Sequence, residues 1–236
     1  MPAVILAVSG RPERRDGLVA AAQRLGALTG NGRVRVLALA PVPSLATEVS
    51  DVATDVLPAG ADVAAEVEAR GSRADFVVIA QPGPDDDKAT RHAFEAALFL
   101  TERPVLMMPP DAPPAAFGQI VAIAWRDDAR ATKALVPALR LLASAEQVHL
   151  FAGVRAGAAT PGIPPVLVEH GVSPTLHVLA IGSEPFGQLL LDRVRELGAD
   201  MLIMGAYVHS PLRERLFGGT TRHVLAHADL PVLLRH

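Results

Sequence analysis

The 236-residue chain contains no cysteine, which excludes disulfides, thiolate metal sites and cysteine nucleophiles. Aromatic residues are scarce at 4%, with one Trp and one Tyr, so there is little with which to stack on single-stranded nucleic acid. Neither sign of charge dominates, because 22 Lys and Arg stand against 25 Asp and Glu, for a net charge of −3. We therefore expect no general attraction to nucleic acid or to an anionic membrane surface.

Long apolar runs are also lacking, and none approaches the roughly 18 residues that a membrane-spanning helix needs. The first apolar run lies within Ala3–Gly10 and has no basic segment before it, so it predicts a β-strand rather than a secretion signal. Half of the residues are hydrophobic and 20% are charged, which is typical of a globular protein with a substantial core. We expect a cytoplasmic protein that contacts no membrane.

Three segments of the first half recur in the second half. In chain order the pairs are Ala3–Gly10 with Gln119–Arg126, Arg73–Ala80 with Gly198–Gly205, and Glu102–Pro110 with Asp229–His236. The middle pair shares a small residue, an Asp and a continuous apolar run, and the last pair shares a Pro that opens an apolar run. This self-similarity indicates a repeat of half the chain. Clustered Pro and Gly in Pro109–Gly118 predict a linker, and hence two domains over residues 1–110 and 117–236.

Within the second half, apolar strands without alternation are separated by helical patterns. We expect a helix over about Asp128–Ala143 that Pro137 kinks, and a short helix near Val166–His170. A third helix is expected to begin at Ser183 as its N-cap and to end at Gly198. This pattern predicts an α/β fold, in which a parallel sheet carries helices on both faces.

The first half has less chain between its second and fourth strands. Its segment Pro41–Ala74 is shorter than the corresponding Gly153–Ala199, so we expect a reduced helix or strand there.

A glycine pair marks the best candidate for ligand binding. Open α/β sheets bind ligands at the carboxyl ends of their strands, where strand order reverses. Gly218 and Gly219 follow such a strand and leave backbone N–H groups uncovered at the start of a helix, where the helix dipole favours an anion. Thr220 and Thr221 could donate hydroxyls to a phosphate or simply cap the helix. Nearby positive charge comes from Arg213, Arg215 and Arg222.

The corresponding loop of the first half is acidic. Asp85, Asp86 and Asp87 lie where its helix should begin, so they can satisfy the free N–H groups themselves and would repel a phosphate. We therefore expect no nucleotide site in the first half.

Other constellations are weaker. His223 and His227 have the spacing of a metal-chelating pair, but no clear acidic third ligand accompanies them. Ser210 lacks a Gly-x-Ser-x-Gly elbow and is followed by Pro211, which argues against a catalytic triad. Trp125, at a strand end, could stack on an adenine or close the core. We predict no catalytic residue and no metal site.

The stretch from Gly205 to Leu234, "GAYVHSPLRERLFGGTTRHVLAHADLPVLL", resembles the end of a universal stress protein domain. The resemblance covers the second half and, more loosely, the first. It implies a tandem member with two Rossmann-like domains of the adenine nucleotide alpha hydrolase-like type, each with a parallel five-stranded sheet and helices on both faces. It also implies that the domains pair through Val105–Met108 and Val232–Leu234 as an intramolecular pseudo-dimer, which could form a homodimer in turn.

The resemblance further implies an adenine-nucleotide site for ATP or AMP with Mg²⁺. The residues that it assigns are Trp125, Arg126, Gly205, Val208, Gly218, Gly219, Thr220 and Thr221. Val208 stands where nucleotide-binding members have a glycine, Gly219 where they have Ser or Thr, and Arg126 where they have Asp. We therefore expect a degenerate nucleotide site in a stress-response binding protein. The alternative is a module of the same fold that binds no nucleotide and acts through an unknown protein partner. Under either interpretation we expect no enzyme activity other than, at most, slow ATP hydrolysis.

Overall fold

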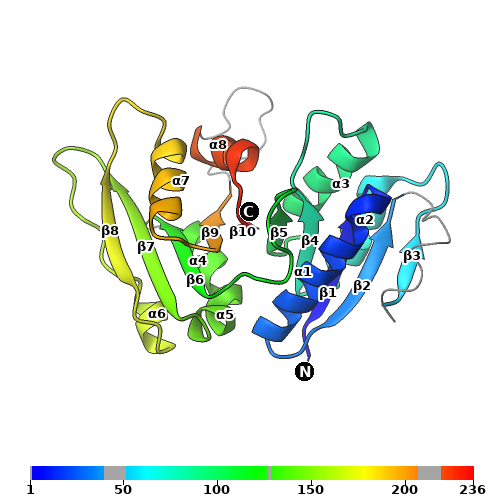
Figure 1. Ribbon diagram of the computed structural model, residues 1–236, viewed down its shortest axis with the longest axis horizontal. Helices are drawn as coiled ribbons and strands as arrows, with labels where there is room; N and C mark the ends of the chain where they lie inside the picture. The colour runs from blue at the N-terminus through cyan, green and yellow to red at the C-terminus, as the bar shows by residue number, and fades with distance from the viewer. Residues whose placement is uncertain (1, 40–51, 127–128, 207–218) are drawn as a thin grey trace. The chain divides into compact units, whose positions relative to one another are not determined.

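The computed structural model describes residues 2–39, 52–126, 129–206 and 219–236, with residues 129 and 130 described by their backbone only (Figure 1). The chain divides into two compact units, Met1–Ala116 and Phe117–His236.

The first unit alternates strands and helices. Its elements are β1 (Val4–Ser9), a 3₁₀ turn (Pro12–Arg14), α1 (Arg15–Leu28), β2 (Arg33–Ala38), β3 (Thr54–Val56), α2 (Val63–Gly71), β4 (Phe76–Ala80), α3 (Lys88–Phe99) and β5 (Val105–Met108). Within the unit the strands follow the order β3-β2-β1-β4-β5, and their pairings are parallel. The central strands are almost wholly apolar and buried, because a parallel sheet is covered on both faces. Helix α1 packs on β1 and β2, while α2 and α3 pack against each other.

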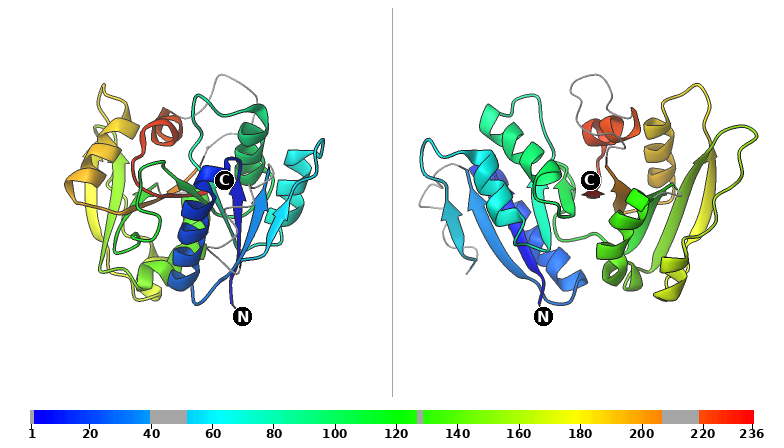
Figure 2. Two further views of the ribbon diagram at one scale, coloured as in Figure 1. Left: turned by 45° about the vertical axis from the view of Figure 1, so that its right-hand side comes forward. Right: turned by 180° about the vertical axis from the view of Figure 1, so that it is seen from behind.

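The second unit also alternates strands and helices. They are β6 (Ile120–Trp125), α4 (Ala129–Leu135), a 3₁₀ turn (Val136–Ala138), α5 (Leu139–Ala143), β7 (Gln147–Val154), α6 (Pro165–Glu169), β8 (Thr175–Ala180), α7 (Phe186–Glu196), β9 (Met201–Gly205), α8 (Gly219–His227) and β10 (Val232–Arg235). Its parallel strands follow the order β10-β9-β6-β7-β8, so each strand has the same neighbours as its counterpart in the first unit. Helices α7 and α8 lie side by side (Figures 1 and 2). The predicted α/β class and parallel sheets are confirmed.

A repeated aspartate explains one of the shared sequence patterns. The Val4 N–H, at the start of β1, donates to Asp75 Oδ2 at 2.7 Å. In the second unit the Gly118 N–H donates to Asp200 Oδ1 at 2.7 Å, and the Gln119 N–H donates to Asp200 Oδ2 at 3.0 Å. Each carboxylate therefore holds the entry of its unit's first strand, beside the strand that follows the Asp.

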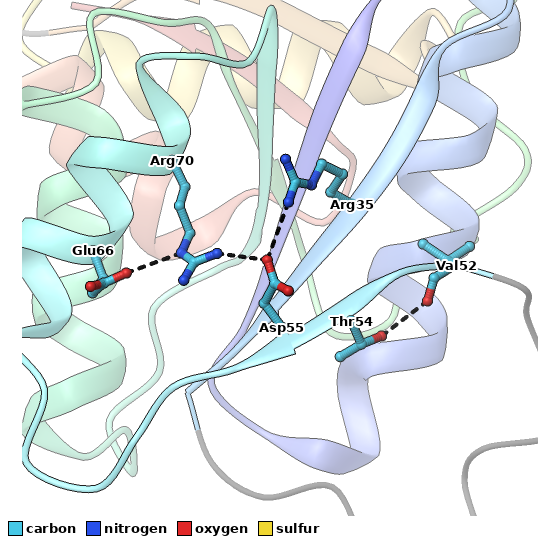
Figure 3. Close-up of polar contacts among 6 residues, drawn as sticks. All are labelled: Arg35, Val52, Thr54, Asp55, Glu66 and Arg70. Atoms are coloured by element: carbon cyan, nitrogen blue, oxygen red, sulfur yellow. Dashed lines mark hydrogen bonds and ion pairs between the residues drawn. The ribbon is translucent and has the colours of Figure 1, made fainter.

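Strand β3 is only three residues long, in line with the shortened segment of the first half, and polar contacts hold it (Figure 3). Asp55 accepts from Arg70 on α2 at 2.6 Å and lies 3.4 Å from Arg35 on β2. Arg70 also donates to Glu66 at 3.1 Å. These side chains are a third to a half exposed, so each pair contributes at most about 1 kcal/mol.

The structure bears on three local predictions in the second unit. The kink at Pro137 is confirmed, because a 3₁₀ turn over Val136–Ala138 separates α4 from α5; proline has no N–H with which to continue the α-helix. The N-cap at Ser183 is wrong, because α7 begins at Phe186 with Pro185 as its N-cap. Proline disfavours helical backbone at the residue before it, which delays the start of the helix. The predicted end at Gly198 is confirmed, because Gly198 directly follows the C-cap of α7, and its φ is +64°.

Candidate functional site

Strand order in the second unit reverses between β6 and β9. These strands are parallel neighbours, and Ala124 pairs with Met204. The next residues, Trp125 and Gly205, therefore end the two strands side by side. Trp125 and Gly205 thus lie at the switch point at which an open α/β sheet binds ligands.

Helix α8 begins at Gly219, the second glycine of the predicted pair. Gly219 is exposed, and a Cβ added there would meet no atom of the described residues within 4 Å. Its first turn contains no acidic residue, so no carboxylate of the turn competes for the positive end of the helix dipole. Thr220 is half-buried, whereas Thr221 is buried. The start of α8 can thus accept an anion at Gly219 and Thr220, while Thr221 packs into the core.

Trp125 is buried, with 7% of its surface exposed. Little of its ring is left to stack on an adenine, and the ring closes the core at the end of β6. Its indole N–H is buried and has no hydrogen-bond partner among the residues that the structure describes. A buried donor left unpaired costs about 1–3 kcal/mol, so this N–H is suited to a polar ligand atom at the same strand end.

The remaining predicted site residues divide into two groups. Arg126 is exposed at the end of β6. Val208 and Gly218 lie outside the described residues, as do Arg213 and Arg215. The residues that can be placed fit an anionic ligand with a hydrogen-bonding group.

The first unit has a different arrangement at its own switch point. The Asp87 carboxylate accepts the Thr90 N–H at 2.7 Å and caps α3. This hydrogen bond lowers the pKa of Asp87, and the charges of Arg91 and Arg11 lower it further. The predicted acidic cap is thus confirmed for Asp87. Asp86 has another role, because its carboxylate lies 2.8 Å from Arg11 Nη2 and accepts the Gly83 N–H at 2.7 Å.

A small cavity of about 30 Å³ lies beside Asp86, between the ends of β1 and β4. It has room for roughly one or two water molecules, far too little for a nucleotide.

Sequence reasoning missed a pair of histidines on adjacent strands. His149 on β7 and His177 on β8 share a hydrogen bond of 3.0 Å between Nδ1 and Nε2, and the His177 ring stacks on Phe151 at 4.9 Å between centroids. Burial lowers the pKa of His149, and the His177 charge lowers it further. The alternation of side chains along β7 could have indicated it, since it places His149, Phe151 and Gly153 on one face of the strand.

His223 and His227 stack on α8 with ring centroids 4.3 Å apart. Burial lowers the pKa of His223, and the charge of His227 lowers it further. Among the residues with described positions, no group of three His, Asp or Glu side chains is arranged to hold a metal. In the same residues, no helix has the length and apolar character that crossing a bilayer demands.

Solved structures with this fold cover nearly the whole chain. A universal stress protein from Archaeoglobus fulgidus is 15% identical with a TM-score of 0.75, covering 100% of this chain and 96% of its own. A putative universal stress protein from Pseudomonas aeruginosa is 16% identical with a TM-score of 0.64, covering 98% and 92%. The cytoplasmic domain of a prokaryotic cation chloride cotransporter is 13% identical with a TM-score of 0.60, covering 99% and 95%. At these identities the likeness concerns the fold alone.

Among proteins of curated function, none matches the sequence of this chain. The sequence profile of the universal stress protein family does match it, over residues 75–236. That range includes β4, β5 and the whole second unit, and it is well over half of the chain. This match establishes that the chain belongs to the universal stress protein family.

Proposed function

We propose that the chain is a stress-response binding protein whose second unit holds one adenine nucleotide, ATP or AMP, at the carboxyl ends of β6 and β9. The start of α8 carries this proposal, because Gly219 is exposed there and the first turn of the helix holds no carboxylate. Trp125 adds a buried N–H without a partner among the described residues. The nucleotide acts by changing the affinity of the chain for a partner rather than by turnover, with at most slow hydrolysis.

Binding is expected to be weak. Val208 and Gly219 depart from the pattern of nucleotide-binding relatives, and the burial of Trp125 removes a stacking surface for the base. Phosphate contacts then carry most of the affinity. ATP should therefore bind more tightly than AMP, because it has more phosphate charge to place at α8.

The test is isothermal titration of the purified chain with ATP–Mg²⁺ and with AMP, after denaturing extraction to detect co-purified nucleotide. Heat at one site per chain, or one extracted nucleotide per chain, supports the proposal. No heat at millimolar nucleotide together with no extracted nucleotide contradicts it.

A second candidate function is a protein-interaction module that binds no nucleotide, and the burial of Trp125 favours it. The variant Val208→Gly separates the two, because it restores the glycine of the family pattern. If the native chain binds no ATP and Val208→Gly does, one side chain has closed the site. If neither binds, the function lies in a protein partner.

A further inference from the structure

In the first unit, strand order reverses between β1 and β4, as it does between β6 and β9 in the second. Val8 pairs with Ile79, so the ends of the two strands lie side by side. The cavity at these strand ends is lined by Gly10 and Arg11 from the β1 loop, by Gln81 and Asp86 from the β4 loop, and by Thr90 of α3. This is the place at which the fold presents its ligand site.

The Asp86 carboxylate fills this place. Its side chain is 6% exposed. A buried Asp needs partners for its charge, and Asp86 has two. The Gly83 N–H donates to Oδ2 at 2.7 Å, and Arg11 Nη2 lies 2.8 Å from Oδ1. A backbone N–H and a guanidinium are the donors that bind a phosphate oxygen in other proteins.

The carboxylate of Asp86 is the partner of Arg11 and of the Gly83 N–H, but the start of α3 does not depend on it. Asp87, not Asp86, caps α3 through the Thr90 N–H. Arg14 lines the same cavity and has no carboxylate partner within the described part of the chain. Loss of the Asp86 carboxylate would therefore leave two arginines and one N–H around a vacated space that has the size of a carboxylate plus one or two waters.

We propose that the first unit retains an anion site of its fold and keeps it closed with its own Asp86 carboxylate, so that Arg11, Arg14 and the Gly83 N–H would bind a phosphate-like oxyanion once that carboxylate is removed. In the native chain the Asp86 carboxylate then occupies the anion site of the first unit, where it connects the β1 loop to the β4 loop. This inference does not rest on nucleotide binding by the second unit.

The test uses the variant Asp86→Ala, titrated calorimetrically with inorganic phosphate at constant ionic strength. All chains also carry Gly219→Asp, which places a carboxylate at the start of α8 and suppresses anion binding there. Asp85→Ala is the matched control, because Asp85 is exposed and its loss changes the net charge by the same amount. We expect phosphate to bind Asp86→Ala at least tenfold more tightly than it binds either the Asp85→Ala chain or the parent chain. The further change Arg11→Ala should remove this gain.

Folding of the variant supplies a second measurement. If Asp86→Ala unfolds in chloride buffer, phosphate should restore its fold where chloride of equal ionic strength does not, since a ligand of the folded state stabilises that state. The proposal is overturned if phosphate neither binds nor rescues Asp86→Ala, if Asp85→Ala gains the same affinity, or if the parent chain already binds phosphate at the first unit.

Discussion

The two units share one strand order, and a functionally important difference between them lies where the fourth strand of each unit leads into a helix. In the first unit, α3 begins directly after its N-cap, Asp87. The carboxylate of the neighbouring Asp86 contacts Arg11 and the Gly83 N–H. In the second unit, α8 begins at Gly219 without an acidic residue in its first turn. The same backbone plan thus presents a filled anion position in one unit and an open helix start in the other.

This difference shows that the fold and the ligand chemistry are specified by separate residues. Asp75 and Asp200 hold the entry of the first strand in both units, and the buried strands are alike. The units differ in a few side chains at the switch point, where the first unit has the Asp86 carboxylate and the first turn of α8 has no acidic residue. The following predictions test that contrast, beginning with the largest expected effect.

Gly187 lets α7 approach α8, and its replacement should disturb the helix that carries the proposed site. A Cβ at Gly187 would lie 2.7 Å from the His223 Cβ and 3.0 Å from the Thr220 carbonyl oxygen. Overpacking costs about 1–3 kcal/mol, while alanine gains up to about 1 kcal/mol of helix propensity over glycine. We expect Gly187→Ala to lower the free energy of unfolding by about 1–2 kcal/mol, measured by urea denaturation.

The matched control is Gly17→Ala in α1, where an added Cβ meets no described atom within 4 Å. Only the propensity gain applies there, so this variant should be more stable by about 0.5–1 kcal/mol. Equal effects of the two variants would contradict the close packing of α7 on α8.

Asp87→Ala removes the side-chain cap of α3 and should cost about 1 kcal/mol of stability. Asp85→Ala, two residues earlier and exposed, should cost almost nothing. The contribution of Asp87 depends on pH because the folded state lowers its pKa. It is complete above the unfolded-state value near 3.8 and is lost as the pH falls through the lower folded value. If Asp87→Ala unfolds at the same denaturant concentration as the native chain, Asp87 is not the cap.

His149 should make the stability of the second unit depend on pH by a smaller amount. Its pKa is lowered in the folded state, so the unfolded chain takes up a proton first as the pH falls below about 6.5. Stability is complete above that pH and declines as the pH falls from there towards the folded pKa. We expect His149→Leu to flatten this slope, as measured by thermal unfolding between neutral and mildly acidic pH. His92→Gln, an exposed substitution in the first unit, should leave the slope unchanged.

Much of the fold could be predicted from the sequence because it rests on local signals. Apolar runs opened by Asp75 and Asp200 marked β4 and β9, and Pro137 marked the break between α4 and α5. The start of α7 was missed, because Ser183 offers a plausible cap and the effect of Pro185 on the preceding residue was given too little weight. Two signals for the helix start lay within three residues of each other, a capping serine and a proline. The steric effect of the proline on the backbone before it decided where the helix begins.

The candidate site was harder to predict because its properties depend on residues that are distant in sequence. Trp125 was correctly placed at a strand end, but its burial, and the lack of a partner for its N–H among the described residues, depend on neighbouring elements. The Arg11–Asp86 contact joins loops that 74 intervening residues separate, and three consecutive aspartates gave no indication of which one caps α3. The His149–His177 pair requires the β7–β8 register, which the sequence does not specify by itself.

The most direct test of the contrast places a carboxylate at the open helix start. Gly219→Asp gives α8 an acidic group at its start, as α3 has, and among the described residues a Cβ at Gly219 meets no atom within 4 Å. Gly219→Asn adds the same bulk without the charge. In titrations with ATP–Mg²⁺, we predict binding at one site by the native chain, retained binding by Gly219→Asn and loss of binding by a folded Gly219→Asp. Binding that is equal in the two variants, or absent from the native chain, would contradict an open anion site in the second unit.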